Sequence, residues 1–255
     1  MRWLEEAVLP APVGCWLKVD TGMHRLGVAA DRAREFFERL CATSNVSGKP
    51  VIYTHFASAD DVNSDQTGQQ MALFDRACDG LPAERSAANS PGLLAWEKAR
   101  YDWVRPGYML YGNSPMLQPH TSADALRPVM TLTSAVISLR QVAAGETVGY
   151  GATWTAGRPS KIATVTIGYG DGYPRLAPNG TPVLVNGRRC GLAGRVSMDM
   201  ITVDVTDLPE VGPGDEVVLW GEGLPLAEVA HHAGTIGYEL TTRMPARIPR
   251  VVIDG

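Results

Sequence analysis

WLKVD at residues 16–20 and DRAREFFERLC at residues 31–41 decide how the first half of the chain folds. The first segment has the composition of a β-strand. The second begins with Asp31, a suitable helix N-cap, and its apolar residues follow the i, i+3, i+4, i+7, i+8 spacing of one helix face: Ala33, Phe36, Phe37, Leu40 and Cys41. A strand followed by an amphipathic helix predicts one unit of a parallel α/β sheet.

The same alternation continues along the chain. We predict a strand in PVIYTH (50–55), helices in QQMALFDRAC (69–78) and LLAWEKAR (93–100), and a strand-like segment in DWVRPG (102–107). In parallel α/β folds the working side chains gather at the carboxyl ends of the strands and in the loops that follow them.

Strands replace helices in the second half of the chain. KIATVTIGY (161–169) alternates between two faces, and Asn186-Gly187 is a strong two-residue hairpin signal. One helix interrupts, with Pro225 in its first turn and Gly234 just past its end. Further strands are predicted in MTLTSAVISLRQV (130–142), PVLVNGRRC (182–190), MITVDV (200–205) and DEVVLW (215–220). This half therefore reads as a mostly antiparallel β domain.

The two halves are joined by SPMLQPHTSADALRP (114–128), which is rich in Pro, Ser and Thr. We place the domain boundary within it, which gives an α/β domain over 1–118 and a β domain over 119–255. The fold class is α/β plus β.

Composition excludes several classes of function. The 255 residues carry a formal net charge of -4, so a broad surface for nucleic acid is not expected. No segment has the roughly 20 apolar residues needed to span a membrane. Glu5 and Glu6 interrupt the stretch where a signal peptide would be apolar, so we expect a cytoplasmic protein. The four cysteines are scattered and form no zinc-like cluster, so we expect reduced thiols and no metal.

Polar residues fall at or just after the predicted strand ends: Lys18, Arg25, His55, Asn89, Ser90 and Arg105. Each has a structural alternative. Lys18 could pair with Asp20 on the same strand face, His55 could be a hydrogen-bonded core histidine, and Arg105 could belong to a structural ion pair. Taken together, the clustering favours a functional site.

Seven motifs in chain order make the sequence resemble the alanine racemase family: LKVDTGMHRLGV (17–28), THFASAD (54–60), ANSPG (88–92), VRPGYMLYG (104–112), VGYGATW (148–154), TIGYGDGYPR (166–175) and GRVSMDM (194–200). The resemblance implies an N-terminal (β/α)8 barrel followed by a C-terminal β domain. It also implies a pyridoxal 5'-phosphate (PLP) enzyme, an isomerase that interconverts L- and D-alanine and supplies D-alanine for peptidoglycan.

The resemblance assigns roles to residues of the first half. His55 would hydrogen-bond the catalytic tyrosine, and Arg25 would steady that tyrosine and the substrate carboxylate. Lys18 matches a lysine that is often carbamylated in the family and supports this arginine. Arg105 would contact the pyridine nitrogen of PLP, and the phosphate would be bound by Asn89, Ser90, Gly107 and Tyr108.

Residues of the second half would act in the site of a partner subunit, so a homodimer is expected. Tyr150 would be the base that works on L-alanine. Tyr169 and Met198 would line the access channel and the region of the substrate carboxylate. A tyrosine ordinarily has a pKa near 10, so it needs cationic neighbours such as Arg25 and His55 to act near neutrality.

One family motif is absent. The lysine that forms the Schiff base with PLP lies in a VVKANAYGHG-like stretch, and none of Lys18, Lys49, Lys98 and Lys161 has that context. A complete barrel takes about 250 residues, whereas the linker here begins at residue 114. We therefore expect a fragment that holds only the C-terminal part of the barrel and is inactive alone. The alternatives are a non-catalytic remnant and an amino-acid racemase of broader specificity.

Overall fold

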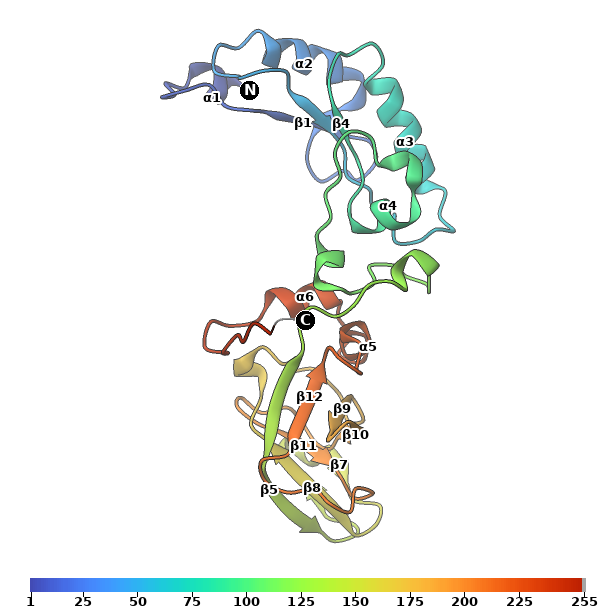
Figure 1. The fold of residues 1–255 in the computed structure, drawn as a ribbon, viewed down its shortest axis with the longest axis vertical. Coiled ribbons are helices and arrows are strands. Elements are labelled where there is room, and N and C mark those ends of the chain that lie inside the picture. The colour runs from blue at the N-terminus through green and yellow to red at the C-terminus, as the bar shows by residue number, and fades with distance from the viewer. Residues whose placement is uncertain (254–255) are drawn as a thin grey trace. The chain divides into compact units, whose positions relative to one another are not determined.

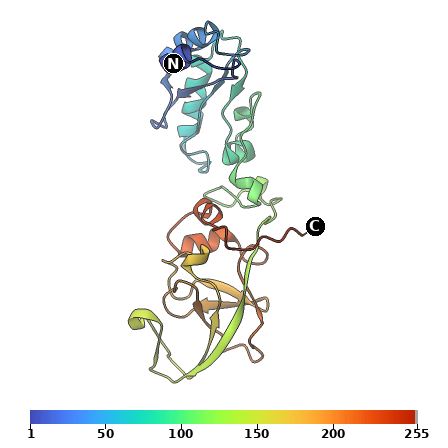
Figure 2. The ribbon, with the colours of Figure 1, turned by 90° about the vertical axis from the view of Figure 1, so that its left-hand side faces the viewer.

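The computed structural model describes residues 1–253 and divides the chain into two compact units (Figures 1 and 2). The first unit comprises Met1–Leu110 and Ser114–Leu126, and the second comprises Tyr111–Asn113 and the chain from Arg127 onward.

The first unit is built on an open parallel sheet of four strands in the order β2-β1-β3-β4. Its strands are β1 Trp16–Asp20, β2 Val28–Ala29, β3 Val51–Tyr53 and β4 Arg85–Ser86. Its helices are α1 Arg2–Glu6, α2 Ala33–Cys41, α3 Gln66–Ala77 and α4 Ser90–Ala95 (Figure 1). The predicted strand–helix alternation and parallel pairing are confirmed.

Burial explains why β1 runs beside α2. Leu17 and Val19 are buried, whereas Trp16, Lys18 and Asp20, which alternate with them, are at least partly exposed. The apolar stripe of α2 packs on the same core, which leaves the polar face of β1 available for a site.

Several predicted boundaries of the first unit were wrong by a few residues. Asp31 lies inside a 3-10 turn, Ala30–Arg32, that precedes α2, and it does not cap the helix. The strand predicted to end at His55 ends at Tyr53. The segment 102–107 makes only a single bridge, between Trp103 and Ser86, although the N–H of Arg105 also donates to the Ala88 carbonyl.

The second unit is a closed antiparallel barrel, in which the strands follow one another as β10-β11-β8-β5-β12-β9. Its strands are β5 Leu132–Val142, β8 Ser160–Val165, β9 Pro182–Val185, β10 Arg188–Leu192, β11 Ile201–Asp204 and β12 Glu216–Trp220. Asn186 and Gly187 join β9 to β10 with φ of 48° and 73°, as the hairpin signal predicted. Closure of the barrel leaves none of these strands as an unpaired edge, a feature that the sequence did not reveal.

The second unit also contains a small hairpin, formed by β6 Thr147–Val148 and β7 Trp154–Thr155. Its helices are α5 Leu226–His232 and α6 Gly237–Thr242. The predicted helix after Pro225 is confirmed, and α6 was missed. Within residues 1–253 the longest helix, α3, has 12 residues, and none of the helices could cross a membrane.

Candidate functional site

Four basic side chains gather on the strands of the first unit or in the segments that follow them. Lys18 lies on β1, Arg25 in the loop after it, His55 just after β3, and Arg105 in the segment bridged to β4. The pKa of His55 lies below its ordinary value because burial disfavours the charged ring and because Arg105, Arg25 and Lys18 repel a further cation. The sequence-predicted cations therefore do share one site.

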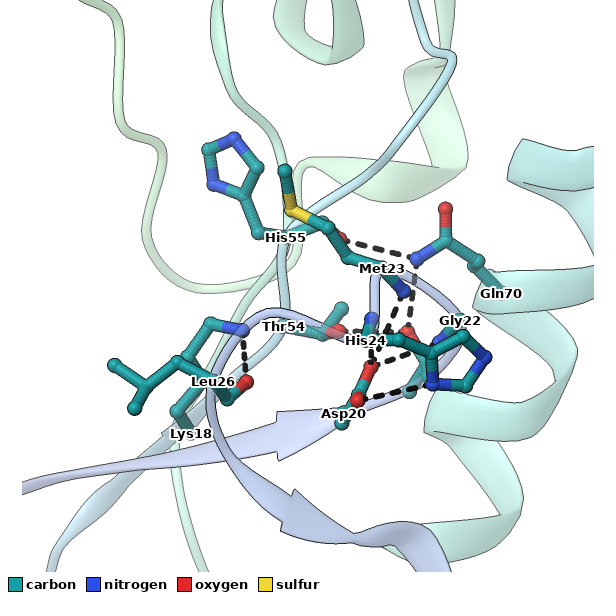
Figure 3. A network of polar contacts seen from close by, with 10 residues as sticks. Lys18, Asp20, Gly22, Met23, His24, Leu26, Thr54, His55 and Gln70 are labelled. Carbon is teal, nitrogen blue, oxygen red and sulfur yellow. Dashed lines mark hydrogen bonds and ion pairs between the residues drawn. The ribbon is translucent and has the colours of Figure 1, made fainter.

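Lys18 does not pair with Asp20, the structural alternative for it. Its Nζ donates to the carbonyl oxygen of Leu26, across the loop (Figure 3). Burial lowers the pKa of Lys18, and the charges of Arg25 and Arg105 lower it further, whereas Asp20 opposes the change. A lysine with a lowered pKa has more of the neutral amine that carbamylation requires.

Asp20 organises the loop that carries Arg25. Its Oδ1 accepts the backbone N–H groups of Gly22, Met23 and His24 at 3.1, 3.1 and 3.0 Å (Figure 3). Burial alone would raise the pKa of Asp20, but the hydrogen bonds from His24 and Gly22 outweigh it and the pKa is lowered. The Asp20 carboxylate is thus occupied within the loop, and the exposed Arg25 has no hydrogen-bond or ion-pair partner in residues 1–253.

Gly27 closes the same loop at a position that requires glycine. Its φ is +122°, and a Cβ there would lie 3.0 Å from the backbone oxygen of Lys18 and from the backbone nitrogen of Asp20. The loop therefore returns tightly onto β1 and holds Leu26 where Lys18 can reach it.

Arg105 is held by neutral groups, and no ion pair involves it within the described residues. Nη1 donates to Ser86 Oγ at 2.5 Å, and Nη2 donates to the carbonyl oxygens of Thr54 at 2.6 Å and Ala87 at 3.2 Å. Its guanidinium also lies over the Tyr53 ring, 5.2 Å from the centroid. Burial lowers its pKa, but an arginine stays protonated. Its Nε–H has no partner in residues 1–253 and can serve a ligand.

A second group of donors surrounds the start of α4. Asn89 caps this helix, because its Oδ1 accepts the N–H of Gly92 at 3.1 Å. The buried Ser90 Oγ accepts the N–H groups of Gly107 at 2.9 Å and Met109 at 3.3 Å, so its own hydroxyl proton is left to donate. Tyr108 is buried beside them at the start of the 3-10 turn Tyr108–Tyr111.

The second unit brings Tyr169 and Met198 together. The N–H of Tyr169 donates to the Ser197 carbonyl at 3.0 Å, and the N–H of Gly170 donates to the Met198 carbonyl at 2.8 Å. A Cβ on Gly168 would lie 2.3 Å from the Met198 carbonyl oxygen, so the two turns approach each other as closely as glycine permits.

Tyr150 occupies a separate turn of this unit. It begins the 3-10 turn Tyr150–Ala152 and is 70% exposed. Gly149 and Gly151 flank it with φ of 76° and 73°, and both pack against Arg195. Glycine adopts positive φ without strain, so Tyr150 lies on a tight turn with its side chain largely exposed.

Two residues that organise the candidate site were missed by sequence reasoning, Gln70 in the first unit and Arg247 in the second. Gln70 lies in the helix predicted over 69–78, where the sequence pattern indicated only that apolar residues pack on the core. Arg247 bonds both Asp171 and Asp199, at 2.7 and 3.0 Å, and so ties the Tyr169 turn to the Met198 turn. Neither residue has a spacing signal, since their partners lie far away in the sequence.

The sequence matches two domain families in chain order. "Alanine racemase, N-terminal domain" matches residues 1–115, and "Alanine racemase, C-terminal domain" matches residues 129–252. The chain belongs to the alanine racemase family. An alanine racemase of Vibrio vulnificus (strain CMCP6) is 52% identical over 249 residues, which are 97% of this chain and 69% of that protein.

Solved alanine racemases have the same fold. The biosynthetic enzyme from Pseudomonas aeruginosa matches with a TM-score of 0.91 and 51% identity over 95% of this chain and 68% of that one. The Bartonella henselae enzyme, solved with covalently bound pyridoxal phosphate, matches with a TM-score of 0.82 and 34% identity over 93% of this chain and 66% of that one. Pyridoxal 5'-phosphate is thus the cofactor of this family, as the resemblance implied.

These matches confirm the expected combination of an N-terminal barrel domain and a C-terminal β domain. They do not confirm that the segment with the PLP lysine is missing, because the N-terminal domain family matches residues 1–115.

Proposed function

We propose that the protein is a PLP-dependent alanine racemase that interconverts L- and D-alanine and supplies D-alanine for peptidoglycan. The observation that carries the proposal is the cluster of Lys18, Arg25, His55 and Arg105, in which none of the cations has a carboxylate partner within residues 1–253. Such a cluster is built for an anionic ligand. The close relatives are named alanine racemase, so neither a remnant nor a racemase of broader range is favoured.

The donor set fits PLP. The Ser90 hydroxyl, with Asn89, Gly107 and Tyr108 beside it, would hold the phosphate where the chain enters α4. The free Nε–H of Arg105 would meet the pyridine nitrogen. Because an arginine does not give up its proton, it would hydrogen-bond this nitrogen without protonating it.

The chemistry needs a proton carrier on each face of the substrate α-carbon. PLP, when bound, supplies an electron sink for the carbon from which the proton leaves. Tyr150 would remove the proton of L-alanine at its phenol oxygen, acting from a partner subunit in a homodimer. Arg25 and His55 would favour its phenolate form, and Arg25 would also bind the substrate carboxylate. Lys18 would support Arg25, and Tyr169 and Met198 would shape the channel from the partner subunit.

The reaction uses free alanine, so we place the protein in the cytoplasm. The test of the whole proposal is complementation. A protein in which residues 1–255 follow a segment with the family's PLP lysine, called the full-length protein below, should restore growth to a bacterium that requires D-alanine, and its His55→Asn variant should restore it poorly. Equal growth with both proteins would contradict the assignment of the site.

We further propose that residues 1–255, as a separate polypeptide, do not turn over alanine. None of the four lysines lies in the context expected for the PLP lysine. The open sheet also leaves Trp16 44% and Trp103 48% exposed, although Trp16 packs edge-on against Tyr53 and Trp103. A site on such a sheet lacks the enclosure that barrel closure gives.

The test is to purify this polypeptide, add PLP, reduce with borohydride and measure its mass, with the Vibrio vulnificus enzyme as the positive control. We expect no stable addition at a single lysine and no racemisation. Stable addition at one lysine together with measurable racemisation would show this second proposal to be wrong.

A further inference from the structure

A buried amide lies behind the basic cluster. Gln70, in the middle of α3, is 1% exposed. Its Nε2 donates to the carbonyl oxygen of His55 at 3.0 Å and to Thr21 Oγ1 at 3.2 Å. Its Oε1 accepts the N–H of Ala57 at 2.9 Å. The side-chain amide therefore joins α3 to the chain that leaves β1 and to the chain that leaves β3.

The contact with Thr21 extends the network toward Arg105. Thr21 Oγ1 and Thr54 Oγ1 are 2.6 Å apart, and both residues are buried. The Thr54 carbonyl in turn accepts from Arg105 Nη2 at 2.6 Å. Hydrogen bonds thus connect Gln70 through Thr21 to the hydroxyl of Thr54, and the backbone carbonyl of the same Thr54 bonds the arginine assigned to the cofactor.

Figure 3 shows the relation of Gln70 to His55. The backbone oxygen of His55 faces the Gln70 amide, whereas the imidazole ring points away from it. Gln70 also packs against Gly22, where a Cβ would lie 3.4 Å from Gln70 Cγ. The amide therefore acts on the backbone of the site and leaves its reactive side chains to the ligand.

We propose that Gln70 is a positioning residue that fixes His55 and the Arg25-bearing loop relative to Arg105. Thr21 and Asp20 are the first attachments of this loop, and Gln70 provides the contact that ties Thr21 to α3. A fully satisfied buried network holds one geometry, and loss of one member leaves buried groups without partners. The inference rests on the proposed roles of His55 and Arg25.

The test uses the full-length protein with bound cofactor and the same protein without it. Gln70→Met keeps the size of the side chain and removes all three hydrogen bonds. Gln69→Met is the matched control, because Gln69 is exposed on the same helix and its side chain bonds nothing in residues 1–253. Thr21→Val removes both hydrogen bonds of the Thr21 hydroxyl, with Gln70 and with Thr54, and leaves the bonds of Gln70 to His55 and Ala57 in place; Thr21→Ser should preserve all of them.

Two readouts separate positioning from stability. The first is the pKa of His55, measured by NMR titration of the isotope-labelled imidazole in the protein without cofactor. The His55 signal is identified by its absence from the spectrum of His55→Asn. In Gln70→Met this pKa should rise toward the ordinary histidine value, because the ring is no longer held in its buried position beside the surrounding cations. The second is steady-state kinetics, in which kcat should fall by about tenfold or more and KM for alanine should rise.

The pattern across variants decides the matter. Gln69→Met and Thr21→Ser should leave both readouts unchanged, and Thr21→Val should shift them in the same direction as Gln70→Met. If Gln70→Met lowers only the thermal midpoint and leaves the His55 pKa and kcat unchanged, the residue is merely structural and the inference is wrong. Should Gln70→Met not fold, Thr21→Val decides by the same criterion. If His55→Asn retains full activity, the proposed function of the site fails instead.

Discussion

Replacement of Asp20 by alanine is expected to loosen the loop that carries Arg25. One oxygen, Oδ1, accepts three backbone N–H groups at 3.0 to 3.1 Å, and Oδ2 lies 3.2 Å from His24 Nδ1. A hydrogen bond to a charged group contributes about 1.5–3 kcal/mol. The three donors share one acceptor and the loop is partly exposed, so water can replace some of them. We therefore expect Asp20→Ala to lower the free energy of unfolding by about 2–3 kcal/mol.

Asp20→Asn is the matched control because it keeps an amide oxygen for the three donors. It should cost about 1 kcal/mol, since only the charge assistance is lost. Urea unfolding of both variants and the parent, extrapolated linearly to water, gives the comparison.

The effect should depend on pH in one direction. The pKa of Asp20 is lowered in the folded protein, because the hydrogen bonds from His24 and Gly22 outweigh burial. The unfolded chain therefore binds more protons in acid, and the stabilisation is complete above the unfolded value of about 3.9. This charge-dependent part is lost as the pH falls through the folded pKa, so in acid the parent should lose its advantage over Asp20→Asn and its advantage over Asp20→Ala should shrink. Equal stability of parent and Asp20→Ala at pH 7, or a difference that persists unchanged in acid, would refute this reasoning.

Three further substitutions test other parts of the site. Asn89→Ala should lower the free energy of unfolding by about 1 kcal/mol because Gly92 loses its cap, and Asn89→Asp, measured beside it by urea unfolding, should not. Gly168→Ala should lower the thermal midpoint and broaden the NMR signal of the Met198 methyl group, because its Cβ would meet the Met198 carbonyl at 2.3 Å; an unchanged midpoint would show that the turns can separate freely. Arg105→Met should weaken PLP binding about tenfold or more in an absorbance titration, since charge-assisted hydrogen bonds are lost, and unchanged affinity would remove Arg105 from the cofactor site.

Local signals in the sequence predicted most elements because each depends on neighbouring residues. The apolar spacing in α2, the Asn186-Gly187 turn and the helix between Pro225 and Gly234 are all encoded within a few residues. The boundaries at Asp31 and Tyr53 were missed because they depend on how a 3-10 turn and a strand end pack, which propensity does not describe.

Contacts between residues far apart in the sequence could not be predicted from local sequence patterns. Closure of the β10-β11-β8-β5-β12-β9 barrel needs pairings between distant segments. The partners of Lys18 and Arg105 were also not predictable, because both bond backbone carbonyls, which carry no sequence signature. The clustering of polar residues at strand ends did indicate where the basic cluster lies, because strand direction alone brings those ends together.

The most direct measurement is the turnover of L-alanine by Tyr150→Phe in the full-length protein, together with its affinity for PLP. The phenol is 70% exposed on a turn framed by two glycines, so its loss should not disturb the barrel. If Tyr150 is the base for L-alanine, turnover should fall by about 100-fold or more while PLP affinity stays unchanged. Undiminished turnover, or a loss of PLP that accounts for the loss of activity, would contradict the assignment.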